Sequence, residues 1–314
     1  MSTNLHIGLS AVILSVQDDS PTFLGTQKSG KLPALPFGKF DPATDRTFEL
    51  ALRRWVAEQT GFPLRHVEQL YTFGDRNRTS EDGPMRDNAD QVRLISVGYL
   101  ALTPTPETVS AGFDAKWRSW YEHFPWEDHR SGTPGIISET LHPRLLTWAA
   151  GNSERLDRIR LAFGLDGQPW IEERVLERYE LLYEAGLVSE ARMDANLPTD
   201  KHDHGRPLLS DHRRILATAI SRIRGKLKYR PVIFDLVDET FTLSGLQHAV
   251  EAILGLRLHK QNFRRALDRS DMLEKTGKME AETGGRPAEL YRFKRALLKS
   301  RSLMGISAPI LKQQ

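Results

Sequence analysis

Alternating and continuous apolar runs predict a sheet in the first part of the chain. Runs rich in β-branched and aromatic residues cover residues 7–16, 22–26, 67–73 and 92–102, and each run has the length and composition of a strand. A helical pattern over residues 46–60 separates the second run from the third and stops at Gly61, a residue type that commonly ends helices. One helix embedded among strands is typical of an α+β fold.

Apolar residues spaced three and four apart predict helices in the middle of the chain. We expect them near residues 138–150 and 153–163, and again from Trp170 to Tyr183. An aromatic cluster precedes these helices, and it consists of Trp117, Trp120, Tyr121, Phe124 and Trp126. Such clusters most often form a core or a subunit interface. This helical extension is therefore a candidate for dimerisation.

The last third of the chain predicts a winged helix-turn-helix. A helix over residues 211–227 has an apolar stripe formed by Ile215, Leu216, Ala219, Ile220, Ile223 and Leu227. A second helix ends at Gly255, and a third covers residues 259–269. Two strand-like segments, 272–279 and 289–293, flank a tip at residues 284–287. Two short helices joined by a glycine-containing turn and followed by a β-hairpin are typical of a DNA-binding module.

The charge distribution supports a polyanionic partner for that last third. The chain carries 44 Lys and Arg against 41 Asp and Glu, a net charge of only +3. After Ser210, however, 21 basic residues face 11 acidic ones, whereas 23 basic residues face 30 acidic ones before that point. A basic third of this size suggests binding to nucleic acid, although a solvated basic surface would give the same count.

The third helix of this part is the predicted recognition helix. Phe263, Ala266 and Leu267 share its apolar side, and the opposite side centres on Gln261 and Arg265. Gln and Asn can pair with adenine, and Arg with guanine, in the major groove of DNA. Arg at the wing tip can enter a minor groove or bind a phosphate. The predicted DNA-binding residues are Lys260, Gln261, Asn262, Arg264, Arg265 and Arg286.

Several classes of chemistry lack sequence support. The chain has no cysteine, which excludes disulfides, thiolate metal sites and a cysteine nucleophile. His202 and His204 lie in a polar loop, which is a weak metal signal, so we expect no metal site. No phosphate-binding glycine motif is present.

The N-terminal apolar run lacks a basic start, and no run is long enough to span a membrane. We therefore expect a cytoplasmic protein without a membrane partner.

Residues of the first part resemble a Nudix box, the G-x5-E-x7-R-E-U-x-E-E-x-G-U signature in which U is bulky and apolar. The matching segments are Leu35-Pro36-Phe37-Gly38-Lys39-Phe40-Asp41-Pro42 and Leu52-Arg53-Arg54-Trp55-Val56-Ala57-Glu58-Gln59-Thr60-Gly61-Phe62. Nudix hydrolases use glutamates of this helix to hold Mg²⁺, a cation that prefers oxygen ligands. Here Arg46, Trp55 and Gln59 stand at three expected glutamate positions, and only Glu58 remains. We expect the fold to be retained and the hydrolase activity to be lost.

Further segments resemble Nudix-like transcriptional regulators of NAD metabolism, of the NadQ type related to NrtR. They are residues 67–75, 97–102, 210–212, 215–219, 224–227, 262–265 and 285–288. The resemblance implies a Nudix-like α/β/α sandwich with a helical extension over residues 1–200, a linker over 201–210 and a winged helix-turn-helix domain over 211–305. It further implies a homodimeric repressor of NAD biosynthesis genes that binds a palindromic double-stranded operator.

The same resemblance implies a nucleotide effector and no required cofactor. Nudix folds bind nucleoside diphosphate derivatives, so the expected effector is an adenine nucleotide, NAD or ADP-ribose. Basic side chains would hold its phosphates and aromatic rings would stack on its base. The candidate residues are Lys39, Arg53, Tyr71, Phe73, Arg76, Arg78, Lys116 and Trp117.

Two other functions remain open from the sequence. The first is an active Mg²⁺-dependent Nudix pyrophosphohydrolase with an accessory DNA-binding domain, which would require Glu58. The second is an RNA-binding factor, which the helix-turn-helix and wing disfavour because single-strand binders prefer sheets with stacking aromatics.

Overall fold

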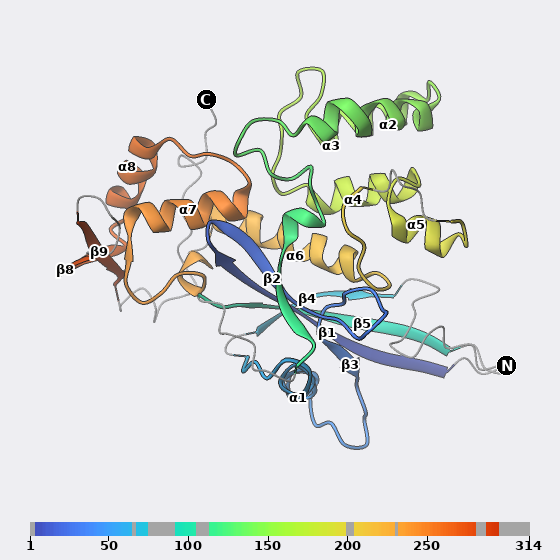
Figure 1. Ribbon diagram of the computed structural model, residues 1–314, viewed down its shortest axis with the longest axis horizontal. Helices are drawn as coiled ribbons and strands as arrows, with labels where there is room; N and C mark the ends of the chain where they lie inside the picture. Colours follow the sequence, from blue (N-terminus) through green and yellow to red (C-terminus); the bar gives the residue numbers. More distant parts are fainter. Residues whose placement is uncertain are drawn as a thin grey trace.

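The computed structural model describes residues 4–64, 67–74, 92–104, 113–198, 204–229, 232–280 and 287–294. A six-stranded sheet and a smaller three-stranded sheet lie apart (Figure 1). Helix α7 contacts both sheets, and α6 lies across the large one. The two sheets correspond to the predicted Nudix-like and winged helix domains. The predicted α+β class is confirmed.

The large sheet is mixed, with the strand order β4-β5-β1-β2-β6 and with β3 paired to β1. Its strands are β1 (Asn4–Gln17), β2 (Ser20–Thr26), β3 (Phe37–Lys39), β4 (Val67–Phe73), β5 (Val92–Leu102) and β6 (Ala115–Ser119). β1 pairs in parallel with β5, and the other pairs are antiparallel. The four strands predicted from sequence are confirmed. β3 and β6 were not predicted, because three to five residues give too short a pattern.

Helix α1 (Phe48–Thr60) covers one face of this sheet. Leu9, Ala11 and Ile13 of β1 alternate toward it and pack with Leu52 and Val56, as the two-residue period of a strand requires. Thr47 caps the start of α1 by accepting a hydrogen bond from the Leu50 N–H, and Gly61 ends it in the left-handed conformation.

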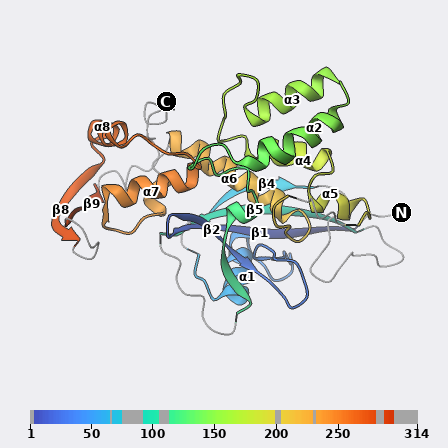
Figure 2. The same ribbon diagram turned by 45° about the horizontal axis from the view of Figure 1, so that its top comes forward.

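A layer of helices covers the opposite face, so the domain is an α/β/α sandwich (Figure 2). In this layer α6 (His212–Tyr229) contacts β4 and β1, and α4 (Val175–Glu184) packs on α6. α2 (His142–Ala149), α3 (Ser153–Phe163) and α5 (Ser189–Asp194) lie further out, beyond α4, with short turns of helix at η1 (Trp120–Glu122) and η2 (Ile137–Leu141). The predicted aromatic cluster supplies core here, because Trp120, Phe124 and Trp126 are fully buried.

Helix α6 is buried along its length rather than lying at the surface of the winged domain. The whole predicted apolar stripe is at most 2% exposed, and Ala217 outside the stripe is buried as well. α6 packs against α4, β4 and α7. The core is therefore continuous from the sheet to the winged helix.

The described part of the expected linker is packed. Leu208 is fully buried and His204 is 9% exposed. The Leu208 N–H donates to Glu190 Oε1 over 3.1 Å, and the Leu209 N–H donates to the Pro33 carbonyl over 2.8 Å. Residues 204–209 thus hold the start of α6 against the first domain. Residues 201–203 lie outside the described residues.

The winged helix follows the predicted order. It contains η3 (Val232–Asp235), β7 (Phe241–Thr242), α7 (Leu243–Leu254), α8 (Lys260–Ser270), β8 (Leu273–Glu280) and β9 (Ala288–Phe293), with the sheet order β7-β9-β8. Phe263 and Leu267 of α8 pack into the core with Phe293 of β9. Gly255 ends α7 at φ 71°, in the left-handed region that glycine favours.

Candidate nucleic-acid interface and effector site

Helix α8 presents a polar face to solvent. Phe263 and Leu267 bury one side of it, and the predicted DNA-binding residues lie on the other. Lys260, Gln261, Asn262, Arg264 and Arg265 are all exposed. None of their side chains has a hydrogen bond or ion pair to another described residue. Arg286, the predicted wing residue, lies outside the described residues. The free donors of α8 have the chemistry needed to contact base edges and phosphates.

The positive charge of the last third is only partly available to a partner. On α6, basic side chains pair with acidic residues of the first part of the chain. These pairs are Arg213–Glu190, Arg214–Glu180, Arg224–Glu127, Lys226–Glu68 and Lys228 with Glu172 and Glu173. Five of the six Lys and Arg side chains of α6 therefore face carboxylates within the chain, so the total charge of the last third overstates the charge that is open to DNA.

The remaining cations gather on the winged helix. Within the described residues after Ser210, six basic side chains have no carboxylate partner: Arg222, Lys260, Arg264, Arg265, Arg269 and Lys278. Arg222 donates to the Leu70 carbonyl, which leaves four cations on α8 and one on β8. These five are exposed and lie on the two elements that a winged helix offers to DNA.

Glu251 fixes the turn that carries α8. Its carboxylate is buried and accepts hydrogen bonds from the Gln247 amide at 2.8 Å, the Leu258 N–H at 2.9 Å and Arg257 at 2.8 Å. Burial raises the pKa of Glu251, but these hydrogen bonds and the Arg257 charge outweigh it and hold the pKa below its ordinary value. Sequence reasoning missed this residue. Its signal was a single carboxylate within an otherwise apolar stretch, residues 249–254.

The Nudix-box positions of α1 bind backbone rather than metal. Gln59 Oε1 accepts from the Phe37 N–H over 3.1 Å, and Gln59 Nε2 donates to the Phe37 carbonyl over 2.6 Å. Trp55 Nε1 donates to the Lys39 carbonyl over 3.0 Å. A Cβ on Gly38 would lie 2.1 Å from the Trp55 ring, so the indole packs directly on that glycine. The side chains that replace glutamates thus hold β3 on α1.

This donor set does not fit a magnesium ion. Glu58, the one glutamate retained in the helix, is exposed and lies 3.7 Å from Arg54. Across the described ranges, no three His, Asp or Glu residues gather closely enough to hold a metal. An amide and an indole supply no anionic oxygen, which is the ligand that Mg²⁺ requires.

The predicted effector residues do not form one cluster. On the α1 side, Trp117 packs with Phe62, with ring centroids 6.1 Å apart. Arg53, on α1 itself, pairs with Glu49 at 2.7 Å. On the opposite side, Phe73 is a core residue only 5% exposed, rather than an open stacking platform.

The remaining effector candidates are more accessible or undescribed. Tyr71 is 60% exposed and lies edge-on to Phe73, with ring centroids 5.3 Å apart. Lys116 is exposed on β6, and Lys39 is exposed on β3 with its Nζ 3.5 Å from His6 Nε2. Arg76 and Arg78 lie outside the described residues. By the strand register the three accessible candidates lie on the face opposite α1, whereas Arg53 and Trp117 lie on the α1 side. The described candidates as a whole therefore cover both faces of the sheet.

Comparison with known proteins finds sequence similarity over the winged helix. The sequence model of the NrtR DNA-binding winged helix domain matches residues 233–293. The ADPR responsive transcriptional repressor NtrR of Acinetobacter baylyi is 40% identical over 86 residues, which are 27% of this chain and 34% of the relative. The match thus spans about a third of that relative's length.

Two solved structures share the fold of nearly the whole chain. Shewanella oneidensis NrtR, crystallised with a 27mer DNA, is 22% identical and has a TM-score of 0.56 over 96% of this chain and 98% of its own. A MutT/nudix family protein from Enterococcus faecalis is 17% identical, with a TM-score of 0.52 over 94% of this chain and 89% of its own. In the part that the structure describes, no helix is both long and apolar enough to cross a membrane.

Proposed function

We propose that the chain, whose residues 233–293 match the NrtR DNA-binding winged helix domain and whose first part has a Nudix-like fold, is a ligand-responsive transcriptional repressor. It binds double-stranded operator DNA through α8 and the wing. It senses an adenine-containing nucleotide in the Nudix-like domain without cleaving it. Its targets are NAD biosynthesis genes. The observation that carries this proposal is the exposed, unpaired cationic face of α8.

DNA is the partner that this face suits. Arg265 and Gln261 centre on the exposed side of α8, one helical turn apart. A guanidinium can bind guanine O6 and N7 together, and an amide can bind adenine N6 and N7. Lys260, Arg269 and Lys278 add charges for phosphate contacts. We propose that the protein acts as a homodimer on a palindromic site, since two-fold protein symmetry is mirrored in such operators.

ADP-ribose is our first candidate effector. The name of the Acinetobacter relative describes it as ADPR responsive, and NAD and ATP are the alternatives that share its adenine nucleotide. Among the candidate contacts, Lys39 and Lys116 offer exposed cations and Tyr71 an exposed ring. Because Trp55 and Gln59 bind β3 instead of metal, we propose that the bound nucleotide is not hydrolysed.

Substitution of Arg265 tests the DNA contact. Arg265→Ala should weaken binding to the DNA upstream of the protein's own gene by about 1–3 kcal/mol and relax the base preference at one operator position. Fluorescence anisotropy at several salt concentrations, on that DNA and on a scrambled sequence, measures both effects. The control is Arg158→Ala, which removes the same charge from α3, where Arg158 pairs with Glu184. Parent-like binding by Arg265→Ala to both DNAs would contradict the role of α8.

The alternative function, a Mg²⁺-dependent pyrophosphohydrolase, has a separate readout. It predicts that ADP-ribose is converted to AMP and ribose 5-phosphate when Mg²⁺ is added. We expect the nucleotide to be recovered intact. Cleavage that disappears in Glu58→Gln would support the hydrolase and contradict our proposal.

A further inference from the structure

The C-terminal end of α7 is held by groups from outside the winged helix. A helix leaves its last carbonyls without partners inside the helix. Here the Tyr121 hydroxyl donates to the Ala252 carbonyl over 2.7 Å, and Arg224 Nε donates to the Ile253 carbonyl over 2.8 Å. Just beyond the helix, the His129 N–H donates to the Gly255 carbonyl over 2.7 Å. The end of α7 is therefore fixed by α6 and by the segment that follows β6.

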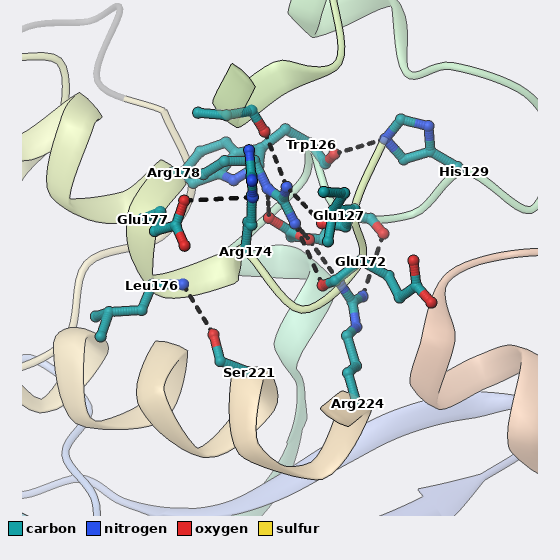
Figure 3. Close-up of polar contacts among 12 residues, drawn as sticks. Trp126, Glu127, His129, Glu172, Arg174, Leu176, Glu177, Arg178, Ser221 and Arg224 are labelled. Atoms are coloured by element: carbon teal, nitrogen blue, oxygen red, sulfur yellow. Dashed lines mark hydrogen bonds and ion pairs between the residues drawn. The ribbon is translucent and has the colours of Figure 1, made fainter. Parts of the chain in front are cut away.

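A buried ionic cluster stiffens that attachment (Figure 3). Glu127 contacts Arg178 at 2.6 Å and Arg224 at 2.5 Å, and all three side chains are at most 1% exposed. Burial raises the pKa of Glu127, but the two guanidinium groups outweigh it and hold the pKa below its ordinary value. Loss of either partner would leave a buried charge uncompensated, which is strongly unfavourable. The cluster is thus a rigid base beneath α7.

Gly255 lets the helix end approach this base closely. It has φ 71°, and a Cβ there would lie 2.2 Å from the Glu127 carbonyl oxygen and 2.9 Å from the Tyr121 hydroxyl. No side chain fits in this space, so the two backbones are in direct contact. A displacement of residues 121–129 must therefore move the end of α7 or break these contacts.

The same segment begins at the edge of the large sheet. β6 is the last strand in the sheet order, and it leads without a break into η1, which contains Tyr121. β6 carries Lys116, one of the proposed effector contacts. On the other side, α7 carries Glu251, whose carboxylate sets the turn before α8. A continuous chain of contacts thus joins β6 to the recognition helix.

We propose that Tyr121, Glu127, His129 and Arg224 form a set of contacts that we call the α7 latch. Through this latch, binding of the effector to the Nudix-like domain changes the position of α8. This inference rests on the proposed function, because it requires an effector and a DNA partner. The effector must favour one of two latch arrangements, since a ligand shifts an equilibrium only through different affinities for its two states. Tyr121 is a positioning residue in this device and touches neither ligand.

Tyr121→Phe tests the latch by removing one hydroxyl and no bulk. Operator Kd is measured with and without saturating ADP-ribose, and the ratio of the two values is the coupling factor, typically about 5–150-fold for allosteric proteins. We expect this factor to fall at least about threefold in Tyr121→Phe, while the Kd of ADP-ribose for the free protein stays at the parent value. By linkage, the factor measured from ADP-ribose binding with and without operator must fall equally.

The matched control is Tyr183→Phe. Its hydroxyl donates to Asp194 Oδ2 over 2.6 Å, away from α7, so this variant should keep the parent coupling factor. An unchanged factor in Tyr121→Phe, or an equal fall in both variants, would overturn the latch.

Hydrogen exchange in the free protein separates failure of the latch from failure of the proposed function. The latch predicts faster amide exchange over residues 250–257 in Tyr121→Phe than in the parent and in Tyr183→Phe. Equal exchange in all three proteins would refute the latch, even if the parent proves insensitive to ADP-ribose. A different outcome is a parent protein that does not respond to ADP-ribose, with amide exchange that is faster only in Tyr121→Phe. That outcome would refute the proposed effector but support the role of Tyr121 in holding α7.

Discussion

At the scale of single residues, Glu251 shows how one buried carboxylate shapes the DNA-binding module. It accepts hydrogen bonds from α7, from the turn and from Arg257. A buried acceptor of this kind must be satisfied, since an unpaired buried charge is costly. The geometry between α7 and α8 therefore depends on the ionised form of one side chain.

Glu251→Gln should lower the free energy of unfolding by about 1–3 kcal/mol at pH 7, because hydrogen bonds to a charged acceptor are lost. The folded-state pKa of Glu251 is lowered, so its stabilisation is present above the unfolded pKa of about 4.3 and is lost as pH falls through the folded value. Urea unfolding between pH 7 and pH 3 should show the parent and variant converging in acid.

The matched control for this prediction is Glu239→Gln, which changes an exposed carboxylate of the same domain. A constant difference in stability between the parent and Glu251→Gln at all pH values would contradict the pH dependence assigned to Glu251.

At the scale of elements, α1 and β3 show how the side chains at the Nudix-box positions support the fold. Gln59 satisfies both backbone groups of Phe37, and Trp55 covers Gly38. These contacts hold a three-residue strand that pairs with β1 along one edge only. The substitutions that remove magnesium ligands thus also supply the contacts that keep β3 in place.

Restoring the Nudix glutamate by Gln59→Glu should therefore destabilise the protein. A carboxylate cannot donate to the Phe37 carbonyl, and it places a negative charge beside that oxygen. We expect the free energy of unfolding to fall by about 1–3 kcal/mol, with no recovery on adding Mg²⁺. Gln168→Glu on the exposed surface is the control. Urea unfolding that shows equal stability for the two variants would contradict this role of Gln59.

Sequence patterns predicted the long helices and strands well. They missed short strands such as β3 and the buried polar residue Glu251. The helix at residues 153–163 was predicted with the bounds of α3, because its apolar period extends over three turns. β3 was missed, since its pairing depends on Gln59 and Trp55 rather than on its own three residues. The exposed face of α8 followed from periodicity alone. The sequence did not predict that the effector candidates lie on both faces of the sheet. The face of each residue depends on strand pairing and register, which are long-range properties.

At the scale of the whole molecule, the acidic first part and the basic last third are electrostatic partners. Five ion-paired cations of α6 bind carboxylates that precede Ser210. α6 therefore joins the two domains by charge as well as by its apolar stripe. Among the described residues after Ser210, the cations left for a polyanion lie mainly on α8 and β8, so the modest net charge of +3 conceals a localised cationic surface.

The most direct test of the central claim is the operator affinity of the full chain with and without ADP-ribose. In fluorescence anisotropy at fixed salt, on DNA from upstream of its own gene, saturating ADP-ribose should change the Kd by at least about fivefold. The nucleotide should be recovered intact afterwards. Equal Kd values with and without ADP-ribose, NAD or ATP, or failure to distinguish this DNA from a scrambled sequence, would contradict the account of an effector-responsive repressor.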